Sequence, residues 1–200
     1  MSENAHPRAD AMDSLTTGEL LELMLTEDRR AIEAMRPVLD RIAEAVDDIA
    51  ERLRAGGRLH YFGAGTSGRL AVLDAAECPA TFGIPADLVQ AHAAGDGEAE
   101  DDHGKGVADA RGAGLGPRDA VVGVSASGRT EYVLAAVAEA KRAGSLVVGL
   151  SCAPGSPLGA AADVARCCVR RKERDPTTRP SSVSSHRTRS AMARTSFSRA

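Results

Sequence analysis

The chain has 200 residues, and its 25 basic and 28 acidic side chains give a formal net charge of −3. This charge is unevenly distributed, because residues 1–166 carry −10 and residues 167–200 carry +7. No apolar run approaches the roughly 20 residues that cross a bilayer, the N-terminus lacks the apolar core of a signal peptide, and the four cysteines form no CxxC pair, so we expect a cytoplasmic protein with no membrane partner and no metal site. Two Tyr and three Phe are too few for a platform that stacks single-stranded nucleic acid, and no specific nucleic-acid partner is expected.

The first predicted elements are helices. Residues 13–25 carry leucines at helical spacing, and a second helix is predicted to begin near Thr26. Pro37 is expected to interrupt or kink that second helix, because its ring removes a backbone donor and crowds the preceding turn. Apolar residues then recur every three or four positions over residues 38–53, which predicts one buried helix face.

Beyond residue 57, short apolar strands alternate with helices. Strands are predicted over residues 58–62, 86–92, 120–124 and 145–151, and helices over residues 69–76, 104–113 and 130–143. Pro79 is expected to close the first of these helices. The alternation indicates an α/β fold, a three-layer α/β/α sandwich with a mostly parallel sheet of about five strands, preceded by N-terminal helices.

The loop after the first of these strands has the spacing GxGxxG, as GAGTSG at residues 63–68. A dinucleotide-binding fold would also need an acidic residue at the end of the next strand, to hold a ribose hydroxyl. Asp87 stands at the start of that strand, and Asp96 follows only after a further turn. The sequence therefore disfavours a nicotinamide cofactor.

A second loop repeats the pattern of the first. Residues 66–69 read TSGR and residues 126–129 read ASGR, each after a strand and at the start of a helix. A helix start offers free backbone N–H groups and a positive dipole end to an anion, and hydroxyl groups add short donors. For either loop alone, helix capping by Ser or Thr is the simpler interpretation. Two such loops on one sheet favour a small phosphorylated ligand.

Four segments carry a family resemblance: GAGTSGRLAVLDAAECPATFG at 63–83, AEDD at 99–102, VVGVSASGRTEYVLAA at 121–136 and GLSCAPGS at 149–156. They resemble the bacterial N-acetylmuramic acid 6-phosphate etherases, which have the sugar-isomerase (SIS) fold. The resemblance implies a homodimeric lyase of peptidoglycan recycling with no cofactor. It would convert N-acetylmuramic acid 6-phosphate and water into N-acetylglucosamine 6-phosphate and D-lactate.

Two other activities stay open at this point. Regulatory relatives share the first segment, so the alternative is a catalytically impaired module that binds sugar phosphates. An aldose–ketose phosphate isomerase on the same fold is a third possibility, against which the Glu-Cys-Pro sequence at residues 77–79 argues.

The resemblance also implies roles for individual residues. Glu77 matches the family's proton donor, and Glu100 matches its second catalytic glutamate, which we assign as the base that removes the proton at C2. An acid at neutral pH needs a raised pKa, which the apolar residues around Glu77 favour. From the residues alone, Glu77 is equally a helix-end carboxylate and Glu100 part of a solvated acidic stretch. The sugar-phosphate contacts that the resemblance implies are Thr66, Ser67, Gly68, Ser125, Ser127, Gly128 and Thr130.

The resemblance runs from about residue 13 to residue 166. It divides the chain into a flexible N-terminus (1–12), N-terminal helices (13–57), a SIS domain that binds sugar phosphates (58–166) and a basic, disordered tail (167–200). The chain departs from the family in a shortened segment between Glu77 and Glu100 and in Glu131, where the family usually has proline. Because the family pattern stops where the basic composition begins, we expect a truncated or frameshifted gene.

Overall fold

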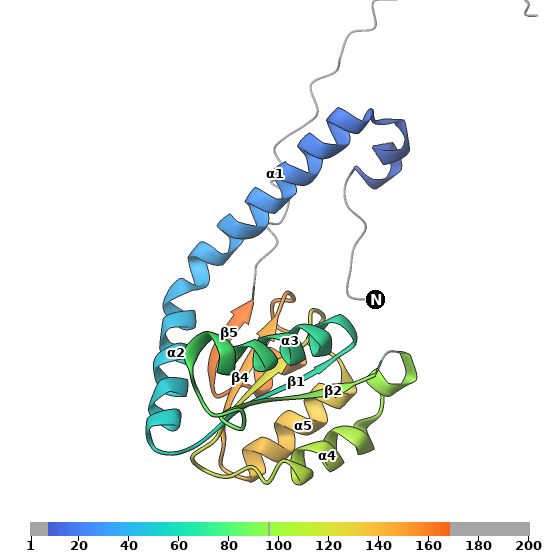
Figure 1. Ribbon diagram of the computed structural model, residues 1–200. Coiled ribbons are helices and arrows are strands. Elements are labelled where there is room, and N and C mark those ends of the chain that lie inside the picture. The colour runs from blue at the N-terminus through green and yellow to red at the C-terminus, as the bar shows by residue number, and fades with distance from the viewer. Residues whose placement is uncertain (1–7, 96, 169–200) are drawn as a thin grey trace, which may run out of the picture.

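Two N-terminal helices precede the sheet and follow one another along the chain, and only the second lies beside the sheet. A computed structural model describes residues 8–95 and 97–168. After a short 3-10 turn, η1 (Ala9–Ser14), helix α1 (Thr17–Met35) begins at a capping box, in which the Thr16 hydroxyl accepts from the backbone N–H of Glu19 and the Glu19 carboxylate accepts from that of Thr16. In Figure 1, α1 projects away from the sheet, whereas α2 (Leu39–Arg54) lies beside it.

The expected break at Thr26 was wrong, and the expected interruption at Pro37 is confirmed. Helix α1 continues through Thr26, because the Thr26 hydroxyl donates to the carbonyl of Glu22, 2.8 Å away and one turn earlier, and so fits inside the helix. Pro37 lies in η2 (Arg36–Val38), a single 3-10 turn that separates α1 from α2.

Five strands form one sheet, and every neighbouring pair is parallel. Their order is β2-β1-β3-β4-β5, so the predicted α/β fold with a mostly parallel sheet of about five strands is confirmed. The strands are β1 (Leu59–Ala64), β2 (Val89–Ala94), β3 (Ala120–Val124), β4 (Leu146–Ser151) and β5 (Val164–Cys168). Only β3 has the predicted bounds; β1 takes in two residues of the expected loop, and β2 begins three residues late.

Helices cover both faces of the sheet, which gives the three layers seen in Figure 1. On one face, α2 and α3 (Gly65–Phe82) pack against Leu59, Val122 and Val148. On the other, η3 (Gly97–Glu100), α4 (His103–Gly112), α5 (Glu131–Arg142) and α6 (Pro157–Ala161) cover Phe62 and Val121. Because successive side chains of a strand point to opposite faces, the strands contribute to two separate hydrophobic cores.

Helix α3 does not end at Pro79, contrary to the sequence-based expectation. It continues to Phe82 and ends at Gly83, whose φ of +66° is the left-handed conformation that glycine adopts without strain. The N–H of Gly83 donates to the carbonyl of Pro79 and closes the last turn. Pro79 is accommodated inside the helix, and the glycine decides where this helix stops.

The predicted tail lies almost entirely outside the described residues. Strand β5 reaches Cys168, two residues beyond the expected boundary at Arg166. Of the N-terminal segment that we expected to be flexible (1–12), only residues 8–12 are described, and residues 9–12 belong to η1. Within the described ranges, no helix combines the length and apolar character that a membrane span requires.

Candidate functional site

The two glycine- and hydroxyl-bearing loops meet at one edge of the sheet. Strands β1 and β3 are parallel neighbours, with Gly63 opposite Val124, so the loops that follow them leave the sheet side by side. From β1 the chain moves outward to β2, whereas from β3 it moves to β4 on the opposite side. Ligands of doubly wound α/β folds bind at such a switch point, beyond the carboxyl ends of the strands.

The first loop is held tightly by glycine. A Cβ placed on Gly68 would lie 2.9 Å from the carbonyl oxygen of Gly63 and 3.0 Å from the Cβ of Ala93, so this position has no room for a larger residue. Thr66 is exposed and its hydroxyl accepts from Arg69 at 2.8 Å, whereas Ser67 is half-buried. The N-cap position of α3 is Ala64, without a side-chain hydrogen bond, so neither hydroxyl caps this helix.

The second loop contains a cluster of hydroxyl groups. The Oγ of Ser125, only 3% exposed, lies 2.8 Å from Oγ1 of Thr130 and 3.3 Å from Oγ of Ser127. Backbone N–H groups of Gly128 and Arg129 donate to Ser125 and Ser127 respectively, at 3.0 and 3.1 Å. Thr130 occupies the N-cap position of α5, and its side chain makes no capping bond there. In both loops, therefore, helix capping does not account for the hydroxyl groups.

The structure places Glu77 away from this edge. It lies twelve residues after Gly65 on α3, about 18 Å along the helix axis at 1.5 Å per residue, and it is exposed. The expectation that Glu77 is buried among apolar residues was therefore wrong for the described chain. Leu70 and Leu73, 61% and 59% exposed, precede it at positions i−7 and i−4 on the same side of the helix.

Glu100, in contrast, lies at the carboxyl edge. It is the last residue of η3, which follows β2, and Ala94 at the end of β2 pairs with Ala64 at the end of β1. Glu100 is half-buried, and η3 contacts α5. The fold thus brings the segment of Glu100, but not Glu77, to the same edge as the two loops.

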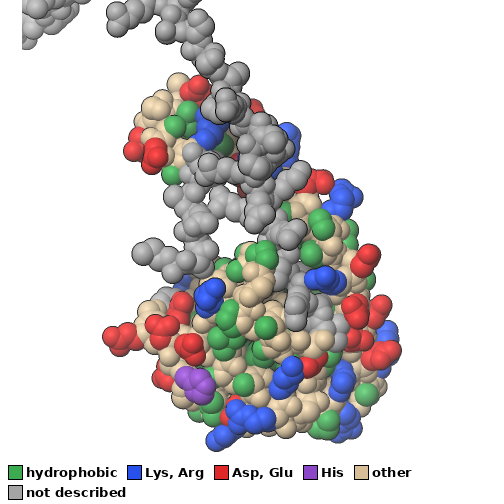
Figure 2. Space-filling model, turned by 180° about the vertical axis from the view of Figure 1, so that it is seen from behind, with side chains coloured by type: hydrophobic (Ala, Val, Ile, Leu, Met, Phe, Trp, Pro, Cys, Tyr) green, Lys and Arg blue, Asp and Glu red, His purple; other side chains and the backbone are tan. Residues whose placement is uncertain are grey.

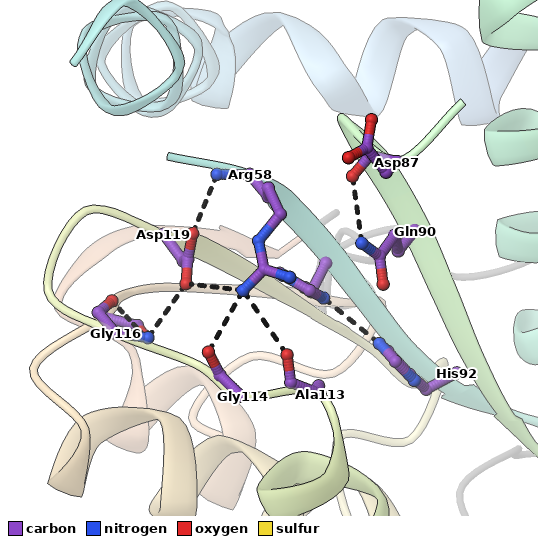
Figure 3. A network of polar contacts seen from close by, with 10 residues as sticks. Arg58, Asp87, Gln90, His92, Ala113, Gly114, Gly116 and Asp119 are labelled. Carbon is purple, nitrogen blue, oxygen red and sulfur yellow. Dashed lines mark hydrogen bonds and ion pairs between the residues drawn. The ribbon is translucent and has the colours of Figure 1, made fainter. Parts of the chain in front are cut away.

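A polar network that the sequence did not reveal occupies the opposite, amino-terminal edge (Figure 3). Asp119, 6% exposed, accepts from the backbone N–H of Arg58 at 2.8 Å, from the Arg58 guanidinium at 3.3 Å and from the N–H of Gly116 at 2.9 Å. Burial works to raise the pKa of Asp119, but these bonds and the Arg58 charge hold it below its usual value. Three donors on one buried carboxylate point to a structural role.

Next to this network, two histidines lie on neighbouring strands. Nδ1 of His60 is 3.1 Å from Nε2 of His92, and the ring of His92 stacks on Phe62 with centroids 4.5 Å apart. His60 is fully buried, and this burial, together with the nearby charge of Arg58, lowers its pKa to about 4. Among the described residues, no three His, Cys, Asp or Glu side chains are grouped so that they could hold a metal ion.

A doubly wound parallel sheet with hydroxyl-rich loops at its switch point defines a class of α/β proteins that hold small ligands at the carboxyl edge. Residues 25–152 match the model of the family described as SIS domain. The chain therefore belongs to the SIS domain family. The shared fold is also seen in phosphoheptose isomerase GmhA from Neisseria gonorrhoeae, with a TM-score of 0.62 and 24% identity over 79% of this chain and 88% of that one.

Curated relatives are more similar in sequence. The chain is 49% identical over 166 residues to the N-acetylmuramic acid 6-phosphate etherase of Rubrobacter xylanophilus, covering 79% of this chain and 55% of that protein. It is 44% identical over 173 residues to the etherase of the same name from Pasteurella multocida, covering 82% and 58%. The chain thus spans little more than half the length of the curated relatives it matches.

Proposed function

We propose that this chain is the sheet domain of a lyase that cleaves the lactyl ether of N-acetylmuramic acid 6-phosphate, giving N-acetylglucosamine 6-phosphate and D-lactate. The observation that carries the proposal is the hydroxyl cluster of Ser125, Ser127 and Thr130 at the switch point of a chain that is 49% identical to an etherase of that name. Such a reaction belongs to cytoplasmic recycling of peptidoglycan and needs no metal or organic cofactor.

The two loops suit the phosphate group of this substrate. Ser125 is buried, so its hydroxyl orients those of Ser127 and Thr130, which are only half-buried and free to meet a ligand. Ser67 and the exposed Thr66 add donors from the first loop. Gly68 and Gly128 let each loop pack closely on the rest of the domain, and the positive end of α3 favours the ligand's negative charge.

The chemistry requires one base and one acid. In the open-chain sugar, the C2 proton is acidic because it lies next to the aldehyde, and we assign its removal to the carboxylate of Glu100. Because Glu77 lies about 18 Å along α3 from the loops of its own chain, we assign the acid to the Glu77 of a second copy. It protonates the ether oxygen as the C3–O bond breaks, which releases D-lactate and leaves a C2=C3 double bond. Water adds at C3, and a proton returns to C2, with the proton transfers reversed. Glu100 is supported by its place at the carboxyl edge, and Glu77 by the family resemblance.

A homodimer would supply what Glu77 lacks in the single chain. The exposed side of α3 that carries Glu77 also carries Leu70 and Leu73, and exposed apolar residues of this size mark surfaces that become buried. A second copy packed on this side would exclude water from Glu77, which is exposed in the single chain. We therefore propose that α3 lies at the interface of the homodimer.

The release of D-lactate tests the proposal. The protein is incubated with N-acetylmuramic acid 6-phosphate, and D-lactate is measured with a coupled dehydrogenase. We expect steady release by the unmodified protein and a loss of at least about 100-fold in Glu77→Ala, because general acid catalysis contributes at least that much. Glu51→Ala, which removes an equally exposed carboxylate from α2, is the matched control and should leave the rate unchanged.

One observation favours a second function, that of a regulatory module that binds sugar phosphates without converting them. Glu77 lies far along α3 from the loops, so in a single chain the binding loops are complete while the acid is absent from them. Binding of the sugar phosphate in calorimetry without any release of D-lactate would establish this alternative and overturn the lyase.

A further inference from the structure

The segment between β4 and α6 lies directly under the second ligand loop. The N–H of Cys152 donates to the carbonyl of Ala126, and the N–H of Leu158 donates to the carbonyl of Gly128, both at 3.0 Å. These two bonds fasten residues 125–130 to residues 152–158 at Ala126 and at Gly128 itself. The position of the ligand loop therefore depends on a segment that has no role in the proposed chemistry.

Two buried serines lie at the two ends of that segment, Ser151 as the last residue of β4 and Ser156 just before α6. Ser151 and Ser156 are 3% and 2% exposed, and their Oγ atoms are 3.0 Å apart. Oγ of Ser156 accepts from the N–H of Gly159, and Oγ of Ser151 donates to the carbonyl of Ala153 at 3.3 Å. Either hydroxyl can be the donor between the two serines. Hydrogen bonds within residues 151–159 thus hold the pair in place.

Gly128 rests directly on this pair. Its φ is +63°, and a Cβ placed on it would lie 2.5 Å from the Cβ of Ser156 and 3.2 Å from that of Ser151. The backbone of the ligand loop therefore approaches the two serines as closely as a residue without a side chain allows. Any change in the volume or orientation of the pair is transmitted to Gly128, and through it to its neighbours Ser127 and Arg129.

We propose that Ser151 and Ser156 are positioning residues that fix the second ligand loop in the conformation that binds phosphate. They set the place of Gly128, and thereby the direction in which the hydroxyls of Ser127 and Thr130 face the ligand. This inference rests on the proposed function for the identity of the ligand, but not for the effect on the loop itself.

The experiment compares Ser151→Ala and Ser156→Ala with Ser145→Ala. Ser145 is a matched control because it flanks the other end of β4, is 4% exposed and donates to the carbonyl of Gly116 at 2.8 Å, so its loss also removes one buried hydroxyl bond. Ser151→Ala is the more direct variant, since Ser156 also caps α6. Each protein is first compared by urea denaturation, so that local effects are judged at known global stability.

Two readouts are taken from each variant. Amide hydrogen exchange should become about tenfold faster at Gly128 in Ser151→Ala and Ser156→Ala and stay unchanged there in Ser145→Ala, because one hydrogen bond of about 1 kcal/mol corresponds to a factor of five to ten. For release of D-lactate, KM should rise about fivefold in the first two variants while kcat stays within about twofold, which is the pattern for lost substrate binding.

The outcomes separate the two proposals. Equal exchange at Gly128 and equal KM in all three variants would overturn the positioning role, because the buried serines would then contribute only general stability. If the unmodified protein neither binds the sugar phosphate nor releases D-lactate, the proposed function fails, and exchange at Gly128 alone still decides whether the serine pair positions the loop.

Discussion

The two faces of the sheet are covered to different degrees. On the α4 and α5 side, Tyr132, Val133 and Val137 of α5 are completely buried. On the α3 side, Leu70, Leu73 and Phe82 are between 59% and 72% exposed. Figure 2, which shows the molecule from behind, has acidic and basic side chains interspersed with small groups of hydrophobic ones.

Close helix packing accounts for the closed face. A Cβ on Gly106 of α4 would lie 3.0 Å from that of Ala135 on α5, so these two helices touch almost backbone to backbone. The hydroxyl of Tyr132 donates to Asp109 at 2.8 Å across the same contact. No comparable partner covers the outer side of α3 within the described residues, and that is the side on which Glu77 lies. The difference supports the proposal that α3 lies at the interface of a homodimer.

The largest predicted difference in the free energy of unfolding is between the loss of an aromatic side chain on one face and on the other. Tyr132→Ala is expected to lower the free energy of unfolding by about 4 kcal/mol, because it leaves a large cavity in the closed core. Phe82→Ala, on the exposed end of α3, should change it by less than about 0.5 kcal/mol in the monomer. Urea denaturation at low protein concentration measures both. Equal losses would show that the two faces are covered to the same degree.

Acid should loosen the closed face, because His60 is buried in it. The pKa of His60 is about 4 in the folded chain, where burial, Arg58 and His92 disfavour its charge and Asp119 opposes them, and about 6.5 in the unfolded chain. Between these values the unfolded state binds more protons, so stability is full above pH 6.5 and falls as the pH drops to 4. The loss should reach about 3 kcal/mol.

Denaturation at pH 7, 5.5 and 4.5 measures this dependence. His60→Gln should flatten the slope between pH 6.5 and 4, whereas His103→Gln, at an exposed position on α4, should leave the slope as it is. An unchanged slope in His60→Gln would mean that other groups, among them His92, whose pKa burial also lowers, account for the acid sensitivity.

The smallest effect on stability is expected for the exposed leucines of α3, whose replacement should mainly affect association. Replacing Leu70 and Leu73 together by Ser is expected to change the free energy of unfolding of the monomer by less than about 1 kcal/mol, since both are largely exposed. The same double variant should convert a dimer into a monomer in sedimentation. Val46→Ser on α2, at 57% exposure, is the control. A dimer that survives the double change would place its interface elsewhere.

The sequence predicted the layers better than the limits of the elements. Alternating apolar runs and glycine loops are local signals, and they were sufficient for the parallel sheet and for the bounds of β3. The ends of the helices were harder to predict. At Thr26, a hydrogen bond from the side chain lets the helix continue, and after Pro79 the helix continues until Gly83 ends it. Such outcomes depend on bonds that the residue types alone do not specify.

Some parts of the candidate site could be predicted from the sequence and others could not, for a similar reason. The hydroxyl loops could be found because each follows a strand and precedes a helix in a repeated pattern. The surroundings of Glu77 could not, since Ala75 and Cys78 beside it in sequence pack against the core, whereas Glu77 itself is exposed and its burial requires a partner. The pair of Ser151 and Ser156 could not be predicted either. The sequence shows only that residue 128 is a glycine, and the serines that it contacts are more than 20 residues away.

The strand order also has a consequence for how the chain acquires its structure. Arg58 and Asp119, joined across the start of β1 and β3, are 61 residues apart, so the centre of the sheet cannot form until more than half of the chain has been synthesised. Loop closure over such distances is slow, and parallel sheets therefore fold on the millisecond-to-second scale rather than in microseconds. During translation, α2 emerges before every strand and must wait with its apolar side chains uncovered until β3, β4 and β5, which it contacts, have been synthesised.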